Sequence, residues 1–87
     1  MKYRIKTMSK RKPIEAVQYN MENLNAIIKL IGSSKVQWQP RAEELSVISL
    51  GRVMKVDRGN YVVRRHDGEV FVIGKQAFEK AYERVER

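Results

Sequence analysis

Residues 56–82 read VDRGNYVVRRHDGEVFVIGKQAFEKAY, and this stretch decides the fold. Two runs rich in β-branched and aromatic residues, 61–65 and 69–73, flank a His-Asp-Gly turn at 66–68. Asp-Gly favours the backbone twist of paired antiparallel strands, so the pattern predicts a β-hairpin. The apolar residues that follow recur at helical spacing and predict a closing helix: Phe78, Ala81, Tyr82 and Val85.

The same signals extend upstream. Strands are predicted in 2–7 and 14–19, and again in 36–39, 45–50 and 53–56. A helix is predicted between these groups because its apolar residues lie on one face: Met21, Leu24, Ile27, Ile28 and Ile31. Asn20 is its expected N-cap, and Gly32 is expected to end it. The predicted fold is α+β, with a small, mainly antiparallel sheet of about five to six strands and two α-helices.

The length and composition describe one folded domain, 1–87. Apolar residues make up 43% of the chain and charged residues 32%, a balance typical of globular domains rather than disordered chains. The chain has no cysteine, which removes disulfides and thiolate zinc sites. No stretch approaches the roughly 20 apolar residues of a membrane span. We therefore expect a cytoplasmic protein with no membrane partner.

The net charge points to an anionic partner. Eighteen Lys and Arg residues against ten Asp and Glu leave a charge of +8. Such a surplus attracts polyanions, and it argues against proteins that imitate DNA phosphates, since those need a surplus of carboxylates. The alternative is that the basic surface serves solubility alone.

The candidate nucleic-acid-binding residues gather near the N-terminus, with one addition from the hairpin. They share a positive charge and positions where a strand or loop would expose them: Lys2, Arg4, Lys6, Lys10, Arg11, Lys12 and Arg64. Arg64 and Arg65 would point to opposite faces of a regular strand 61–65, so one of them at most would join a patch on one face. The competing interpretation of the N-terminal group is a solvated edge strand that lysines protect against aggregation.

Trp38 is the candidate partner-binding residue. It lies between two glutamines in a short predicted strand that ends at Pro40. A tryptophan in this setting can fill the core, contact a partner, or stack on a base, which would contribute roughly 1–3 kcal/mol. We rank base stacking last of the three.

Catalysis has little support. The one histidine, His66, falls in a predicted exposed turn, and one histidine without cysteine disfavours a structural metal site. The glycines are spaced as hairpin turns rather than as a phosphate-cradling loop. We therefore expect no enzyme, no metal and no cofactor.

The chain resembles a family of small, mostly uncharacterised phage and prophage proteins that carry Pro-Gly-Asp-Tyr at a turn near the C-terminus. The residues that carry the resemblance are Gly59-Asn60-Tyr61, with Arg58 in place of the proline, and the Phe78/Tyr82 pair. The N-terminal MKYR and the segment KPIEAVQY at 12–19 are also similar. Asn makes the same turn bonds as Asp, so the turn survives the change. The resemblance implies a phage accessory protein in the host cytoplasm and supplies no catalytic residues.

Two functions remain. The first is a non-enzymatic phage accessory protein, a basic module that contacts DNA or RNA. The alternative is an inhibitor or modulator that binds an acidic host or defence protein through an edge strand or the surface around Trp38. An assembly component that acts through homo-oligomers is a third option, and the sequence leaves the oligomeric state open.

Overall fold

The computed structural model describes residues 2–5 and 14–84. In chain order, its elements are β1 (Lys2–Ile5), β2 (Ile14–Gln18), α1 (Leu24–Ile31), the 3-10 turn η1 (Ser33–Lys35), β3 (Val36–Gln39), β4 (Glu44–Ser49), β5 (Arg52–Val56), β6 (Tyr61–Arg64), β7 (Val70–Ile73), α2 (Lys75–Ala81) and β8 (Tyr82–Arg84). The predicted α+β class is confirmed. The described part has eight strands rather than five or six, and they form two antiparallel sheets.

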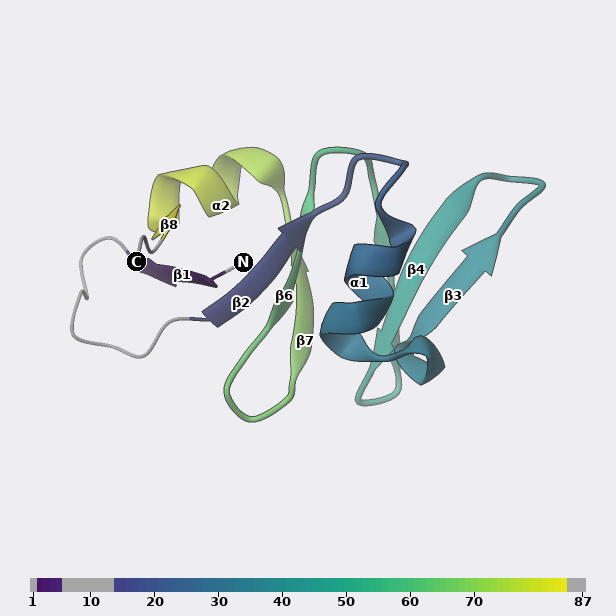
Figure 1. Cartoon of the computed structure of the whole chain (residues 1–87), viewed down its shortest axis with the longest axis horizontal. Coiled ribbons are helices and arrows are strands. Elements are labelled where there is room, and N and C mark those ends of the chain that lie inside the picture. The colour runs from purple at the N-terminus through teal and green to yellow at the C-terminus, as the bar shows by residue number, and fades with distance from the viewer. Residues whose placement is uncertain (1, 6–13, 85–87) are drawn as a thin grey trace.

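The larger sheet has the strand order β7-β6-β2-β1-β8, and the smaller one has the order β3-β4-β5 (Figure 1). The predicted hairpin is present, with Arg64 opposite Val70 and Tyr61 opposite Ile73. In Figure 1, α2 lies over the β1–β8 side of the larger sheet, while α1 lies between that sheet and the β3-β4-β5 sheet.

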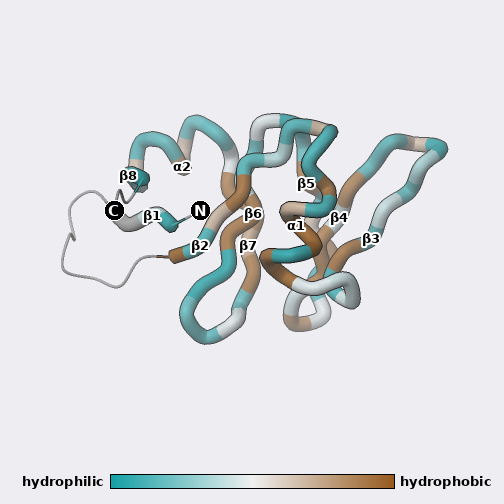
Figure 2. The backbone as a smooth tube through the Cα atoms, viewed as in Figure 1, coloured by the Kyte–Doolittle hydropathy of each residue, from teal (hydrophilic) through white to brown (hydrophobic). Residues whose placement is uncertain are grey.

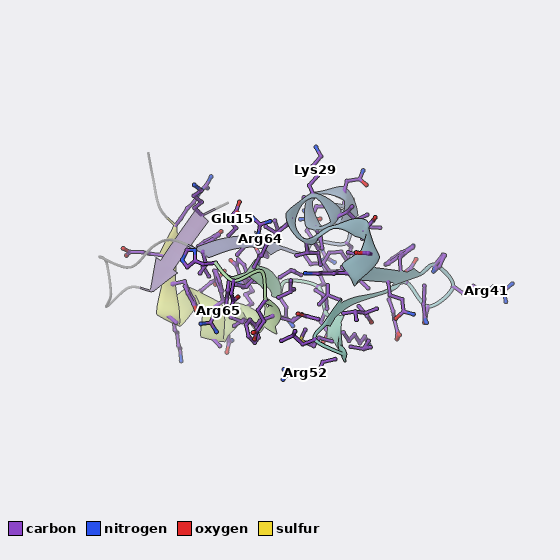
Figure 3. All side chains as sticks on the ribbon, turned by 90° about the horizontal axis from the view of Figure 1, so that it is seen from below. Glu15, Lys29, Arg41, Arg52, Arg64 and Arg65 are labelled. Atoms are coloured by element: carbon purple, nitrogen blue, oxygen red, sulfur yellow. The ribbon has the colours of Figure 1, made fainter. Side chains whose placement is uncertain are left out.

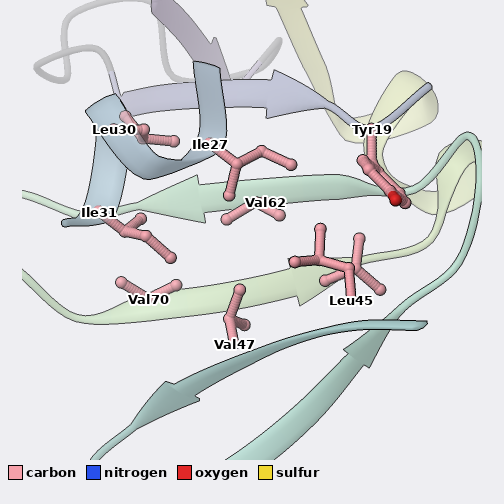
Figure 4. Packing of buried hydrophobic residues seen from close by; sticks show 9 residues of the cluster. Tyr19, Ile27, Leu30, Ile31, Leu45, Val47, Val62 and Val70 are labelled. Atoms are coloured by element: carbon pink, nitrogen blue, oxygen red, sulfur yellow. The ribbon is translucent and has the colours of Figure 1, made fainter. Parts of the chain in front are cut away.

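β6 is buried on both faces because it lies between two apolar layers. Tyr61 and Val63 pack with Phe78 of α2 on one face. Val62 faces the other way, into a core built from α1, β4 and β7 (Figure 4). Figure 2 shows the same division, since the hydrophobic colour follows β4, β6 and β7 while the β6–β7 turn is hydrophilic.

α1 begins later than the sequence predicts. Met21 has φ +73 and lies outside the helix, and Asn23, not Asn20, is the N-cap residue. The Asn20 side chain instead accepts a hydrogen bond from the backbone N–H of Glu22 at 2.8 Å, which closes a local turn. Gly32 ends the helix as predicted, with φ +92 and its N–H donated to the Ile28 carbonyl.

α2 ends earlier than the sequence predicts. The helical spacing extends to Val85, but the helix stops at Ala81, and Tyr82 begins β8. β8 pairs with β1, with Tyr82 opposite Ile5, and so satisfies backbone groups along that edge. Tyr82 still stacks on Phe78, with 4.7 Å between the ring centroids, so its apolar contact with α2 is kept.

Neither helix of the described residues has the length and apolar character needed to cross a bilayer.

Candidate nucleic-acid interface

The structure brings two of the predicted nucleic-acid-binding residues onto one face of the larger sheet. Lys2 of β1 and Arg64 of β6 both lie directly opposite Glu15 of β2, which separates them. Lys2 is exposed. Arg4 lies on β1, but its side chain is outside the described part, and four further predicted residues lie outside the described residues altogether: Lys6, Lys10, Arg11 and Lys12.

Three connections meet at one end of the molecule, which we call the turn end: η1, the β4–β5 turn (50–51) and the β6–β7 turn (65–69). They project to the lower side of Figure 1. Lys35 Nζ donates to the Gly68 carbonyl at 3.5 Å and so links η1 to the β6–β7 turn. A hollow of about 340 Å³ is lined by residues of all three connections, among them Leu50 and Asp67.

Arg64 makes contacts that stabilise the fold. Its guanidinium forms an ion pair with Glu15 and donates to the Leu30 carbonyl at 3.1 Å. That carbonyl belongs to the last turn of α1, where carbonyls lack helical partners and a cation is favourable. Arg64 therefore ties β2, β6 and α1 together, which limits the number of its N–H groups available to a ligand.

Arg65 is more available. Its backbone N–H donates to the Glu69 carbonyl at 2.9 Å and closes the turn. Its guanidinium carbon lies 5.5 Å from the centroid of the Phe71 ring, a cation–π arrangement that restrains the side chain. The Arg65 side chain is exposed and forms no ion pair with a carboxylate of residues 2–5 or 14–84.

Arg64 and Arg65 reach toward opposite faces of the larger sheet, as the strand alternation predicts. Arg64 reaches the Leu30 carbonyl of α1, whereas Arg65 lies over Phe71, which is opposite Val63 on the face that packs against α2. Both arginines line one hollow of about 330 Å³ together with Glu15, His66 and Gly68. Figure 3 shows Arg64 beside Glu15, with Arg65 nearby. The prediction that His66 lies in an exposed turn is confirmed.

The turn end also holds carboxylates. Glu15 is paired with Arg64. The Asp67 side chain accepts the backbone N–H of Glu69 at 2.9 Å, which stabilises the β6–β7 turn. These contacts already engage two of the nearby acidic groups, so their charge is partly compensated before an anion approaches.

The β4–β5 turn carries residues that the sequence analysis did not select. Leu50 and Gly51 both have positive φ, and Leu50 is exposed at the tip. Arg52 follows, exposed, with no ion pair in the part of the chain that the structure describes. The sequence predicts a turn at Gly51, but nothing in the sequence indicates that the leucine before this glycine stays exposed.

Trp38 lies away from the turn end, on β3, the outermost strand of the smaller sheet in Figure 1. It is opposite Leu45, so both side chains belong to the sheet face that carries the core. Leu45 is fully buried, whereas Trp38 is 37% exposed because it lies farther from the centre of that core. Its position fits both a partial core role and a partner contact.

Two buried tyrosines keep their protons at neutral pH. Burial, followed by a hydrogen bond donated to Glu79 at 2.9 Å, raises the pKa of Tyr61 to about 12. Burial, with a smaller contribution from the charge of Glu43, also raises the pKa of Tyr19. The Tyr19 hydroxyl has no hydrogen-bond partner among the described residues. Within those residues, no three His, Asp or Glu side chains form a group that could hold a metal ion.

Comparison with known proteins gives no match, whether to a family model, a curated protein or a solved structure.

Proposed function

We propose that the protein is a basic binding module that contacts the phosphates of DNA or RNA through its turn end. The observation that carries the proposal is the hollow lined jointly by Arg64 and Arg65, with the exposed Arg65 guanidinium unpaired by any carboxylate of the described residues. Lys35 ends η1, and Arg52 directly follows the β4–β5 turn at the same end.

Arginine suits this role because its planar guanidinium donates two parallel hydrogen bonds to phosphate oxygens. The Phe71 ring holds the Arg65 guanidinium on one side, which reduces the freedom that binding must remove. The net charge of +8 adds attraction at longer range and favours encounter with a polyanion over encounter with a neutral ligand.

The remaining expectations stay predictions. Phage origin, an accessory role without catalysis and a cytoplasmic location depend on the resemblance and on composition. The contribution of the four lysines and arginines at 6–12 also stays a prediction, and the proposal does not depend on them. The competing proposal is a host-protein inhibitor that uses Trp38, supported by the partial exposure of that side chain on an outermost strand.

Substitution of Arg65 by Gln tests the proposal. A labelled 20-base-pair duplex and a single strand of equal length would each be titrated with the wild type and with R65Q at several salt concentrations. We expect weaker binding and a salt slope that is smaller by about 1, as for the loss of one phosphate contact. Comparing duplex DNA, duplex RNA and single strands identifies the preferred form.

Arg58→Gln is the matched control. Arg58 is exposed, lies in the 57–60 turn before β6, and lacks an ion pair in the described part of the chain. The 57–60 turn lies on the upper side of Figure 1, opposite the turn end, so R58Q removes the same charge from a different part of the molecule. Equal losses in R65Q and R58Q would show that binding depends on overall charge and would contradict the assignment to the turn end.

A further inference from the structure

The β4–β5 turn has a residue that its backbone disfavours. Ser49 and Arg52 are directly opposite each other, which leaves Leu50 and Gly51 as a two-residue turn with φ +53 and φ +75. Turns with positive φ at both central positions strongly favour Asn-Gly or Gly-Gly. Leucine is strained there because its Cβ crowds the backbone in the left-handed region.

Packing does not compensate for that strain. Leu50 is 79% exposed, more than any other large apolar side chain of the described residues. Val53, on the outer face of β5, is 62% exposed, and Ile48 lies directly opposite it. The tip is therefore an exposed apolar projection in a conformation that favours Asn or Gly, and backbone outliers of this kind cluster at functional sites.

Charges of both signs lie near this projection. Arg52 follows Leu50 by two positions, and Lys35 lines the same hollow as Leu50, together with Asp67 and Glu69. The Asp67 side chain already accepts the backbone N–H of Glu69. That hollow and the one lined by Arg64 and Arg65 share Gly68 in their linings, so the two hollows adjoin. With the exposed Arg52 two positions away and a net charge of +8, the apolar tip suits a polyanion with an apolar interior better than it suits a neutral surface.

We propose that Leu50 is a wedge that inserts from the minor groove between base pairs of a duplex, while Arg52 and Arg65 contact the flanking phosphates. This inference rests on the proposed nucleic-acid function and adds duplex deformation to it. Proteins that bend DNA commonly insert an apolar side chain between base steps, and the bend lets more cations reach the backbone. A strained, exposed leucine beside arginines meets that requirement.

Leu50→Asn tests the wedge without threatening the fold. Asparagine tolerates positive φ, so the variant should unfold at a higher temperature than the wild type. The probe is a 20-base-pair DNA duplex with a donor and an acceptor dye on its two ends. We expect the wild type to shorten the distance between the dyes, and L50N to lose that shortening and roughly tenfold in affinity.

Met21→Asn is the matched control. Met21 also has positive φ and an exposed apolar side chain, but it lies between β2 and α1, away from the turn end. M21N should gain thermal stability and bend DNA as the wild type does. Equal loss of bending in both variants would overturn the wedge.

The outcomes separate this inference from the proposed function. If L50N keeps wild-type affinity and bending while salt-dependent binding persists, the wedge is wrong and the proposed function stands. If the wild type shows no salt-dependent binding, both fail. If L50N binds DNA normally but loses a protein retained from nuclease-treated lysate, Leu50 contacts a protein and the wedge is overturned.

Discussion

At the scale of single residues, contacts and exposure separate residues that stabilise the fold from residues whose charge stays exposed. Arg64 donates to the end of α1 and pairs with Glu15, whereas the Arg65 guanidinium lies over the Phe71 ring. Two adjacent arginines of identical chemistry thus have different roles because one ends a strand and the other begins a turn. Arg64→Gln should therefore lower stability more than it lowers affinity.

Tyr61 gives a residue-scale prediction that depends on pH. Its raised pKa of about 12 means that, above the ordinary value of 10.0, the folded state holds a proton that the unfolded state has released. Stability from this hydroxyl is therefore complete below about pH 10 and is lost as the pH rises towards 12, a loss of about 2–3 kcal/mol. Tyr61→Phe removes both the hydroxyl and this dependence.

Urea denaturation of the wild type and Y61F checks that prediction. At about pH 7 the variant should be less stable by about 1 kcal/mol, because the hydrogen bond to Glu79 is gone. The difference should shrink and then reverse in sign between about pH 10 and 12, because the wild type loses more than this 1 kcal/mol. A difference that stays constant across this range would contradict the buried, protonated state of Tyr61.

At the scale of elements, α2 is held by one aromatic contact set. Phe78 is almost fully buried and stacks on Tyr61, with 3.9 Å between ring centroids, and on Tyr82. Phe78→Ala should lower the free energy of unfolding by about 3–5 kcal/mol, since it leaves a cavity between α2 and the larger sheet. Gln76→Ala, at an exposed position of the same helix, should change it by less than about 0.5 kcal/mol. Similar small losses in both variants would contradict this account of how α2 docks.

The elements that the sequence predicts well are those with local signals. The Asp67-Gly68 hairpin needs two neighbouring runs and a turn, all within 61–73, and it is present. β8 has no such signal, because Tyr82 continues the helical spacing and becomes a strand through pairing with β1, almost eighty positions earlier. The division of the strands into two sheets likewise depends on pairing between residues that are far apart in the sequence.

The residues of the candidate site were likewise predicted only in part from the sequence. The positive charges in the sequence predicted Lys2 and Arg64 as nucleic-acid-binding residues, and both lie beside Glu15 in the sheet. The sequence could not show that Arg64 would be engaged by the Leu30 carbonyl, nor that Arg65 would line the same hollow. Leu50 was missed because exposure of an apolar residue depends on which neighbours the fold supplies.

At the scale of the whole molecule, the two sheets bring three connections of different sequence origin to one end. The segments 33–35, 50–51 and 65–69 are separate in the chain, yet they line adjoining hollows. Five of the eighteen basic residues lie outside the described residues: Lys6, Lys10, Arg11, Lys12 and Arg87. The described part accordingly contains most of the cations available for phosphate contact.

The most direct test of the central claim is the salt dependence of wild-type binding to a duplex. Plotting the logarithm of the association constant against the logarithm of salt concentration gives a slope near −0.9 for each phosphate neutralised. With Lys35, Arg52 and Arg65 in contact, we predict a slope of about −2.7 or steeper. An association constant that hardly changes between low and moderate salt, or no measurable binding at low salt, would contradict the claim that the turn end binds nucleic acid.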